Sequence, residues 1–265
     1  MYDFNYHRPA TLDEAKRILA GNDEAKLVAG GMTLLPTMKM RLASPSDLID
    51  LSSVDDLNGI NDTGNAIEIG AMTTHADVAA SDVVRAGIPA LAALADMIGD
   101  AQVRNRGTLG GSIANSDPAA DYPAAVVGLN ATVRTDRREI PADDFFTGMF
   151  ETALEDDEVI VSVSFPKPAK AAYAKFPNPA SRYAVVGVMV AETGGEIRVA
   201  VTGAGAHAHR ASAFEQALQG EFAAGALDGL SVDASELNDD LHASAEYRAH
   251  LVGVMAKRAV ESIAG

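Results

Sequence analysis

The segment RGTLGGSIANSDPAAD, residues 106–121, combines glycines, small polar side chains and carboxylates in a spacing that suits a phosphorylated ligand. Gly110 and Gly111 lack a Cβ, so we expect positive φ there and backbone N–H groups that approach an anion. Further neutral donors lie close by in the sequence: Thr108, Ser112 and Asn115. The segment therefore predicts a phosphate-binding loop.

Two aspartates lie near the end of this segment. Asp117 followed by Pro118 predicts a helix start, because aspartate is a good N-cap and proline suits the first helical turn. The positive end of that helix would face the phosphate. Asp117 and Asp121 would repel a phosphate, so we expect them to accept hydrogen bonds from ribose or ribityl hydroxyls.

An earlier segment, KLVAGGMTLLP at residues 26–36, repeats the arrangement in a simpler form. A short apolar strand leads into Gly30 and Gly31, then Thr33, then a helical stretch with proline in its first turn. Either glycine pair alone is equally explained as a tight turn. Two such units in one chain, each flanked by hydroxyl groups, favour two contact points for one long diphosphate ligand.

The composition narrows the class of protein. A chain of 265 residues with 48% hydrophobic residues predicts a globular protein of two or three subdomains. Its net charge of −16 opposes binding to nucleic acid. The chain has no cysteine, so any iron–sulfur cluster that supplies electrons must be on another chain. No run reaches the roughly 18 apolar residues of a membrane helix and no signal peptide is evident, so we expect a cytoplasmic protein without an integral membrane segment.

The periodicity of the sequence divides it into three parts. The first, residues 1–55, begins with a capping box at Thr11 and Glu14 and continues as a β-α-β unit. The second, residues 56–166, contains the main segment and an alternating strand at 158–165. The third, residues 167–265, starts after a proline pair and predicts three antiparallel strands (173–176, 183–190 and 197–202) and two helices (211–219 and 244–263).

The pair AGGMT (29–33) and TLGGSIANSDPAAD (108–121) resembles the two FAD-binding motifs of the flavoprotein subunits of molybdenum hydroxylases. The likeness covers nearly the whole chain and is strongest to the medium subunit of aerobic carbon monoxide dehydrogenase, a relative of the FAD domain of xanthine dehydrogenase. The resemblance implies an α+β fold: a two-subdomain FAD-binding fold of the PCMH or vanillyl-alcohol-oxidase type, then a C-terminal α+β domain with a three-stranded antiparallel sheet.

The resemblance also assigns FAD contacts to single residues. A lysine at position 175 would lie close to the flavin and raise its potential, although a surface lysine is the simpler explanation. Tyr183 would lie beside the isoalloxazine ring, with a core aromatic as the alternative, and Ile98 and Ile160 are either flavin contacts or ordinary core. The predicted cofactor residues are Lys26, Leu27, Val28, Ala29, Gly30, Gly31, Met32, Thr33, Ile98, Thr108, Gly110, Gly111, Ser112, Asn115, Asp117, Asp121, Ile160, Lys175 and Tyr183.

The function implied is electron transfer through FAD. Electrons would come from the [2Fe–2S] clusters of a small subunit, beside a large molybdopterin subunit, in a dimer of heterotrimers. The acceptor is quinone, NAD or dioxygen, and no residue of this chain need act as acid, base or nucleophile. Carbon monoxide is the substrate that we expect first, ahead of a purine, aldehyde or N-heterocycle. Position 32 is a methionine where many relatives have histidine, and this difference leaves the substrate open. The segment 102–106 is expected to approach a partner or the flavin edge.

Two rival functions and two weaker motifs remain. A stand-alone flavin reductase of the same fold would need its own proton donor, and none is evident; a non-catalytic nucleotide-binding module is the other rival.

The segment 203–208 fits G-x-G-x-x-A, but the helix after it is too short for a dinucleotide-binding unit, which favours a glycine turn. His207 and His209 lack a third ligand in the sequence nearby, so we expect no metal.

Overall fold

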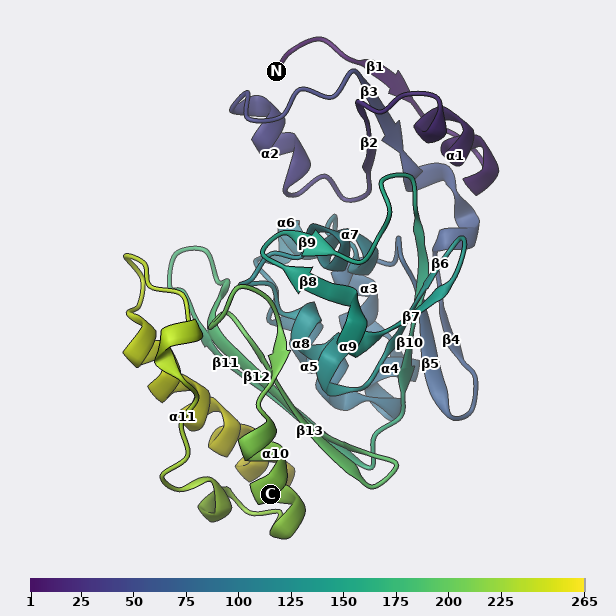
Figure 1. Ribbon diagram of the computed structural model, residues 1–265. Helices are drawn as coiled ribbons and strands as arrows, with labels where there is room; N and C mark the ends of the chain where they lie inside the picture. The colour runs from purple at the N-terminus through teal and green to yellow at the C-terminus, as the bar shows by residue number, and fades with distance from the viewer. Residues whose placement is uncertain (265) are drawn as a thin grey trace.

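A computed structural model describes residues 1–264 and shows three parts stacked along the molecule (Figure 1). The N-terminal part is a parallel sheet in the order β1-β3-β2, which confirms the predicted β-α-β unit. Thr11 Oγ1 accepts from the Glu14 amide at 3.3 Å, so the predicted capping site begins the first helix. The elements are β1 (Asn5–His7), α1 (Leu12–Ala20), β2 (Ala25–Val28), α2 (Leu34–Lys39) and β3 (Asp47–Asp50).

The middle part is an antiparallel sheet covered by helices. Its strands are β4 (Ile60–Asp62), β5 (Ala66–Gly70), β10 (Ile160–Pro166), β6 (Thr132–Thr135) and β7 (Glu139–Pro141), in that spatial order. The central strand β10 comes from the segment whose alternation predicted a strand, and Val163 and Phe165 are fully buried in the core. Its helices are α3 (His75–Ala80), α4 (Asp82–Gly87), α5 (Pro89–Asp96), α6 (Ala101–Arg104), α7 (Leu109–Asn115), α8 (Tyr122–Gly128) and α9 (Ala142–Phe145).

The C-terminal part is an antiparallel sheet of β11 (Lys170–Pro177), β12 (Ala184–Thr193) and β13 (Glu196–Thr202), as predicted. A two-residue strand, β14 (His209–Arg210), adds to the edge beside β13, so the three-stranded prediction was one strand short. The glycine segment 203–208 is the turn that leads into this edge. Two helices follow close to the predicted ranges, α10 (Ser212–Gly220) and α11 (Ala245–Ala264).

Strand β12 is apolar and buried from Ala184 to Ala191 because both faces of its sheet are covered there. Val186, Val188 and Val190 belong to the core beneath α10 and α11, whereas Met189 faces the core of the middle part. A Cβ added at Gly128 of α8 would lie 2.6 Å from Met189 Cγ, so glycine lets this helix approach the sheet closely. The C-terminal sheet is therefore fixed against the middle part by core packing.

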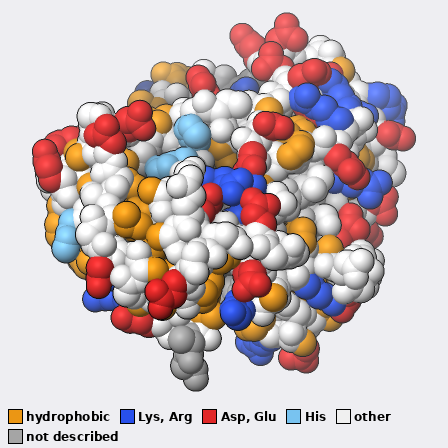
Figure 2. Space-filling view, turned by 60° about the horizontal axis from the view of Figure 1, so that its bottom comes forward, with side chains coloured by type: hydrophobic (Ala, Val, Ile, Leu, Met, Phe, Trp, Pro, Cys, Tyr) orange, Lys and Arg blue, Asp and Glu red, His pale blue; other side chains and the backbone are white. Residues whose placement is uncertain are grey.

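The surface is acidic but mixed. On the face that Figure 2 shows, acidic side chains are widely spread and basic ones stand among them singly or in small groups. This pattern fits the net charge of −16. Between residues 1 and 264, no helix has the length and apolar character required to span a membrane.

Candidate cofactor site

A cavity of about 920 Å³ is lined by all three parts of the chain. Every residue that the sequence assigned to the cofactor lines it, with the exception of Lys175. We call the lining around Ile98, Asp121 and Tyr183 one end of the cavity, and the lining around Leu154, Glu155 and Val159 the other. Both glycine motifs line the same cavity. The structure thus brings residues 26–33 and 108–121 to one site.

The first glycine motif is the loop between β2 and α2. Gly31 has φ +72°, a conformation that favours glycine, as a tight loop requires. A Cβ added at Gly30 would overlap the carbonyl oxygen of Arg106 and lie 2.8 Å from Gly107 Cα. The two motifs therefore touch directly. The N–H groups of residues 30–33 make no hydrogen bond to any described residue, so they remain available to an anionic ligand.

The second glycine pair has a different conformation from the one predicted. Gly110 and Gly111 do not have positive φ; they lie in the first turn of α7, with Thr108 as the N-cap. Thr108 Oγ1 accepts from the Gly111 amide at 3.1 Å, and the Gly110 amide donates to the Ala71 carbonyl at 2.8 Å. A Cβ added at Gly110 would lie 2.6 Å from that of Ala71. Gly110 serves close packing against Ala71, which directly follows β5, and the amides of both glycines are not free for an anion.

The helix predicted to start at Asp117 and Pro118 is also absent. Asp117 Oδ1 accepts from the Ala119 amide at 2.9 Å in a local turn, and the next helix, α8, begins at Tyr122. The strong capping signal belongs to Thr108 instead, which places α7 ahead of the aspartates. Burial raises the pKa of Asp117, so this lining carboxyl is costly to ionise.

Asp121 is a buried carboxylate of the site. It is 4% exposed, and its Oδ2 accepts from Lys175 Nζ at 2.9 Å while its Oδ1 accepts from Tyr173 Oη at 2.5 Å. The Lys175 side chain is only 2% exposed and also donates to the Met97 carbonyl at 3.1 Å, so the surface-lysine alternative is wrong. Lys175 reaches the cavity through Asp121. Burial raises the pKa of Asp121, and the bonds from Lys175 and Tyr173 oppose that rise.

The same end of the cavity is bounded by a turn from the C-terminal sheet. Tyr183 precedes β12 and is 43% exposed, which excludes the alternative of a core aromatic. Arg182, with φ +62°, donates from Nη1 to the Gly99 carbonyl at 3.3 Å and so ties this turn to the loop after α5. Partial burial, with Asp117 and Asp121 nearby, raises the pKa of Tyr183. An aromatic side chain that stands exposed at a cavity mouth is suited to flank a planar ring.

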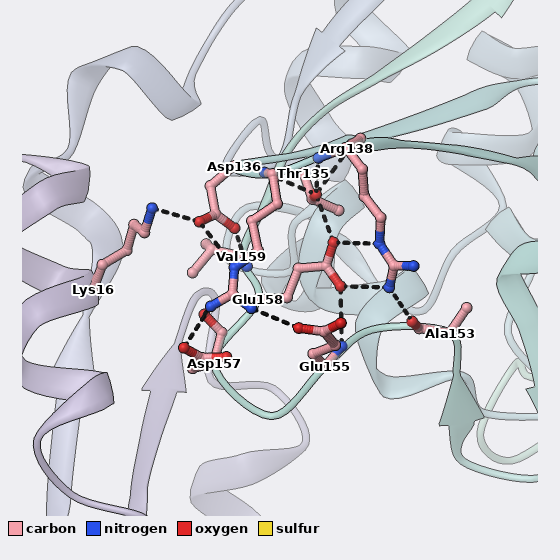
Figure 3. A network of polar contacts seen from close by, with 10 residues as sticks. Lys16, Thr135, Asp136, Arg138, Ala153, Glu155, Asp157, Glu158 and Val159 are labelled. Atoms are coloured by element: carbon pink, nitrogen blue, oxygen red, sulfur yellow. Dashed lines mark hydrogen bonds and ion pairs between the residues drawn. The ribbon is translucent and has the colours of Figure 1, made fainter.

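The opposite end carries a network of ion pairs (Figure 3). The Glu158 carboxylate accepts from Arg138 Nε at 2.9 Å and Nη2 at 2.8 Å, and from Thr135 Oγ1 at 2.7 Å. The hydrogen bonds from Arg138 are the main reason that the pKa of Glu158 falls to about 2. Lys16 of α1 reaches Asp136 at 2.6 Å and joins the N-terminal part to this wall. Asp136, Glu155 and Glu158 are thus each matched by a cation.

Sequence reasoning missed several lining residues. His75, at the start of α3, lines the cavity, and a Cβ added at Gly107 would lie 2.5 Å from its Nε2. Burial lowers the pKa of His75 to about 4, so the ring is neutral at pH 7. The only sequence signal was its place after the capping residue Thr74. The wall at 147–156 had no recognisable signal: Thr147, Phe150, Glu151, Thr152, Leu154, Glu155 and Asp156.

These features fit a flavin dinucleotide. The cavity is lined by apolar and aromatic side chains at Ile98 and Tyr183, by free loop amides at Gly30 and Gly31, and by residues of β2. The buried carboxylates of Asp121 and Glu158 are each paired with a cation, so neither presents an unmatched charge to a ligand. Among the described residues no cluster of histidine and acidic side chains is arranged to hold a metal.

Comparison with known proteins places these features in context. Residues 2–168 match the model for the FAD binding domain in molybdopterin dehydrogenase, and residues 171–263 match the CO dehydrogenase flavoprotein C-terminal domain. The carbon monoxide dehydrogenase medium chain of Hydrogenophaga pseudoflava is 38% identical, covering 98% of this chain and 96% of that one. The nicotine 6-hydroxylase medium subunit of Paenarthrobacter nicotinovorans is 36% identical, covering 96% and 95%. A solved structure of carbon monoxide dehydrogenase from Hydrogenophaga pseudoflava superposes with a TM-score of 0.90 at 38% identity, covering 99% and 97%.

Proposed function

The chain belongs to the family of FAD-binding domains of molybdopterin dehydrogenases that end in a CO dehydrogenase flavoprotein C-terminal domain, and we propose from this that it is the FAD-binding, electron-transferring subunit of a molybdenum hydroxylase. The observation that carries the proposal is the single cavity lined by both glycine motifs. FAD supplies the redox chemistry, because it can accept electrons one at a time and release them as a pair. The protein's part is to bind and orient it.

Different residues of this chain would bind and orient FAD. The free amides at Gly30 and Gly31 would bind the diphosphate, and Ile98 and Tyr183 would flank the ring. The paired Lys175 and Asp121 would set the charge beside the ring without exposing either group to water. The ion pairs around Glu158 would hold the wall of the other end. No lining side chain has to act as acid, base or nucleophile in such a role.

The partners follow from what this chain lacks. It has no cysteine, so it cannot hold an iron–sulfur cluster through thiolates. We propose a small subunit with [2Fe–2S] clusters and a large molybdopterin subunit, assembled as a dimer of heterotrimers in the cytoplasm. The relatives are named as medium chains or medium subunits, which supports a multi-subunit complex.

The substrate belongs to the large subunit. Carbon monoxide is our first proposal, because the relative with 38% identity is a carbon monoxide dehydrogenase medium chain. The similar identity of 36% to a nicotine 6-hydroxylase subunit keeps N-heterocycles close behind, and Met32 at the first glycine motif does not decide between them. Quinone, NAD and dioxygen are the candidate electron acceptors.

The proposal is tested by affinity purification of the tagged chain from its own host. We expect two further chains, one carrying molybdenum and one carrying iron, and bleaching of the flavin absorbance when the complex is given carbon monoxide under anaerobic conditions. A purine, an aldehyde and an N-heterocycle are tried in parallel and decide the substrate. A chain that purifies alone with FAD and is reduced directly by NADPH would instead be a stand-alone flavin reductase.

A further inference from the structure

Tyr173 is a buried side chain that reaches the cofactor site without lining it. It lies on β11, two residues from Lys175, so both side chains point to the same face of the strand. Its hydroxyl donates to Asp121 Oδ1 at 2.5 Å, and Lys175 Nζ donates to Oδ2 at 2.9 Å. Each oxygen of this lining carboxylate therefore has its own donor from β11.

The place of the Tyr173 hydroxyl is fixed from the opposite side. Gly187 of β12 pairs with Lys175 in the sheet, and a Cβ added there would overlap Tyr173 Oη and lie 2.8 Å from its Cζ. Gly187 does not have positive φ, so it is required for space and not for backbone conformation. The hydroxyl thus lies between Gly187 and Asp121, with Asp121 Oδ1 as its acceptor.

Few charged and titratable groups lie next to the Asp121 carboxylate. Lys175 is the cation in contact with it, and Tyr173 is the neutral donor; burial raises the pKa of Tyr173 well above its ordinary value, so it keeps its proton. The other titratable groups that face the carboxylate are Asp117, Tyr122 and Tyr183. With Asp121 ionised, its charge cancels that of Lys175.

We propose that Tyr173 is a positioning residue that acts through Asp121: its hydrogen bond keeps the carboxylate ionised and oriented beside Lys175, so that the net charge at the flavin end of the cavity stays near zero. This rests on the proposed function, since it takes the isoalloxazine ring to lie at the end bounded by Asp121 and Tyr183. Loss of the hydroxyl removes a donor that favours the ionised carboxylate. Asp121 then takes up a proton at higher pH, and the unmatched cation of Lys175 favours the reduced, more negative flavin.

The test is Tyr173→Phe in the intact complex, with the midpoint potential of the FAD followed from pH 5 to 9. We expect the flavin equilibrium to shift toward the reduced form by about tenfold at the acid end, which is about 30 mV for a two-electron couple, and to return to the wild-type value at the alkaline end. Asp121→Asn makes the side chain at position 121 permanently neutral. Adding Tyr173→Phe to it should therefore not change the FAD midpoint potential or its pH dependence any further.

Tyr122→Phe is the matched control. Tyr122 is also a fully buried tyrosine next to this site, it does not line the cavity, and its hydroxyl has no hydrogen-bond partner among the described residues. Its removal should leave the potential and its pH profile unchanged. If Tyr173→Phe retains its full FAD content and has the wild-type profile, Tyr173 only fills space and the proposal is wrong.

A second measurement does not depend on flavin. The infrared band of a protonated carboxyl is followed with pH in Tyr173→Phe and in Tyr173→Phe with Asp121→Asn. We expect the band to appear at higher pH than in the wild type and to be missing from the double variant; an unchanged titration overturns the proposal. A chain that binds no FAD at all would contradict the proposed function, while this titration still decides the role of Tyr173.

Discussion

The two ends of the cavity solve the same electrostatic problem in different ways. At the end bounded by Tyr183, the Asp121 carboxylate meets one cation and one phenol, and all three side chains are almost fully buried. At the other end, the Glu158 carboxylate is equally buried, but its partner Arg138 is 45% exposed and belongs to a wider network of ion pairs. Neither carboxylate is left unmatched beside the ligand.

The pKa directions show what this difference means. At Asp121 desolvation is the largest influence and the pKa rises, whereas at Glu158 the hydrogen bonds from Arg138 are the largest and the pKa falls to about 2. A buried pair has few substitutes for a lost partner, while a half-exposed network has water and neighbouring charges. The flavin end should therefore be sensitive to single changes, and the far end tolerant of them.

The largest effect is expected from Lys175→Met. This change leaves Asp121 buried without its cation, and removal of one partner of such a pair costs about 3–5 kcal/mol of unfolding free energy. Urea denaturation measures the loss. Adding Asp121→Asn should recover part of it, because the unmatched charge is then gone.

Lys170→Met is its control, since Lys170 lies on the same strand with a side chain that is 48% exposed. We expect that change to stay within about 0.5 kcal/mol of the wild type. If both lysine variants lose the same small amount, the buried pair is no more important than a surface one, and the contrast between the two ends disappears.

The next effect is expected at the contact between the two glycine motifs. Gly30→Ala places a methyl group on the Arg106 carbonyl and must move one motif away from the other. Such overpacking costs about 1–3 kcal/mol, so we expect FAD to bind about 10- to 100-fold more weakly, measured by fluorescence titration of the flavin-depleted complex. Gly225→Ala, where an added Cβ meets nothing within 4 Å, should bind FAD like the wild type. If Gly30→Ala binds FAD as tightly as the wild type, the contact between the two glycine motifs does not support the cofactor site.

A smaller effect, with a distinct pH dependence, is expected from Arg138→Gln at the far end. The folded-state pKa of Glu158 is about 2, below its ordinary value of 4.5, so the pair stabilises the fold above pH 4.5 and loses that effect as the pH falls toward 2. The variant should be less stable than the wild type at pH 7 and should approach it in acid. Urea denaturation at several pH values measures this. A constant difference across the range would mean that Arg138 acts through packing.

The smallest effect is expected from Lys16→Met, which removes the link between α1 and the wall at Asp136. Arg137 remains 3.7 Å from the same carboxylate and can replace part of the charge. We expect a loss of about 0.5 kcal/mol at low salt that fades as salt is added. A loss as large as that of Lys175→Met would show that both ends are equally sensitive.

The sequence predicted the elements and the members of the site better than their conformations. Strands, helices and the N-cap at Thr11 follow from local patterns, and these were found. A glycine pair, however, permits either a positive φ or close packing, and only the tertiary structure distinguishes these two roles. Gly110 is a glycine because of Ala71, a distant residue just after β5 that no local pattern could connect to it.

Long-range partners explain the other differences. Lys175 is 54 residues from Asp121 along the chain, so its burial and pairing could not be read from the alternating strand on which it lies. The helix start at Asp117 was a reasonable local prediction, but Thr108 begins a helix earlier and the aspartate forms a turn instead. His75 and the wall at 147–156 carry no motif, and the folded chain alone brings them to the cavity.

The most direct test of the cofactor assignment is the flavin content of the purified complex, by its visible spectrum and by the mass of the ligand released on heating. We expect flavin absorption bands and FAD, with one molecule for each copy of this chain. A colourless complex that takes up no added FAD would contradict this assignment, and so would one that releases FMN and no FAD.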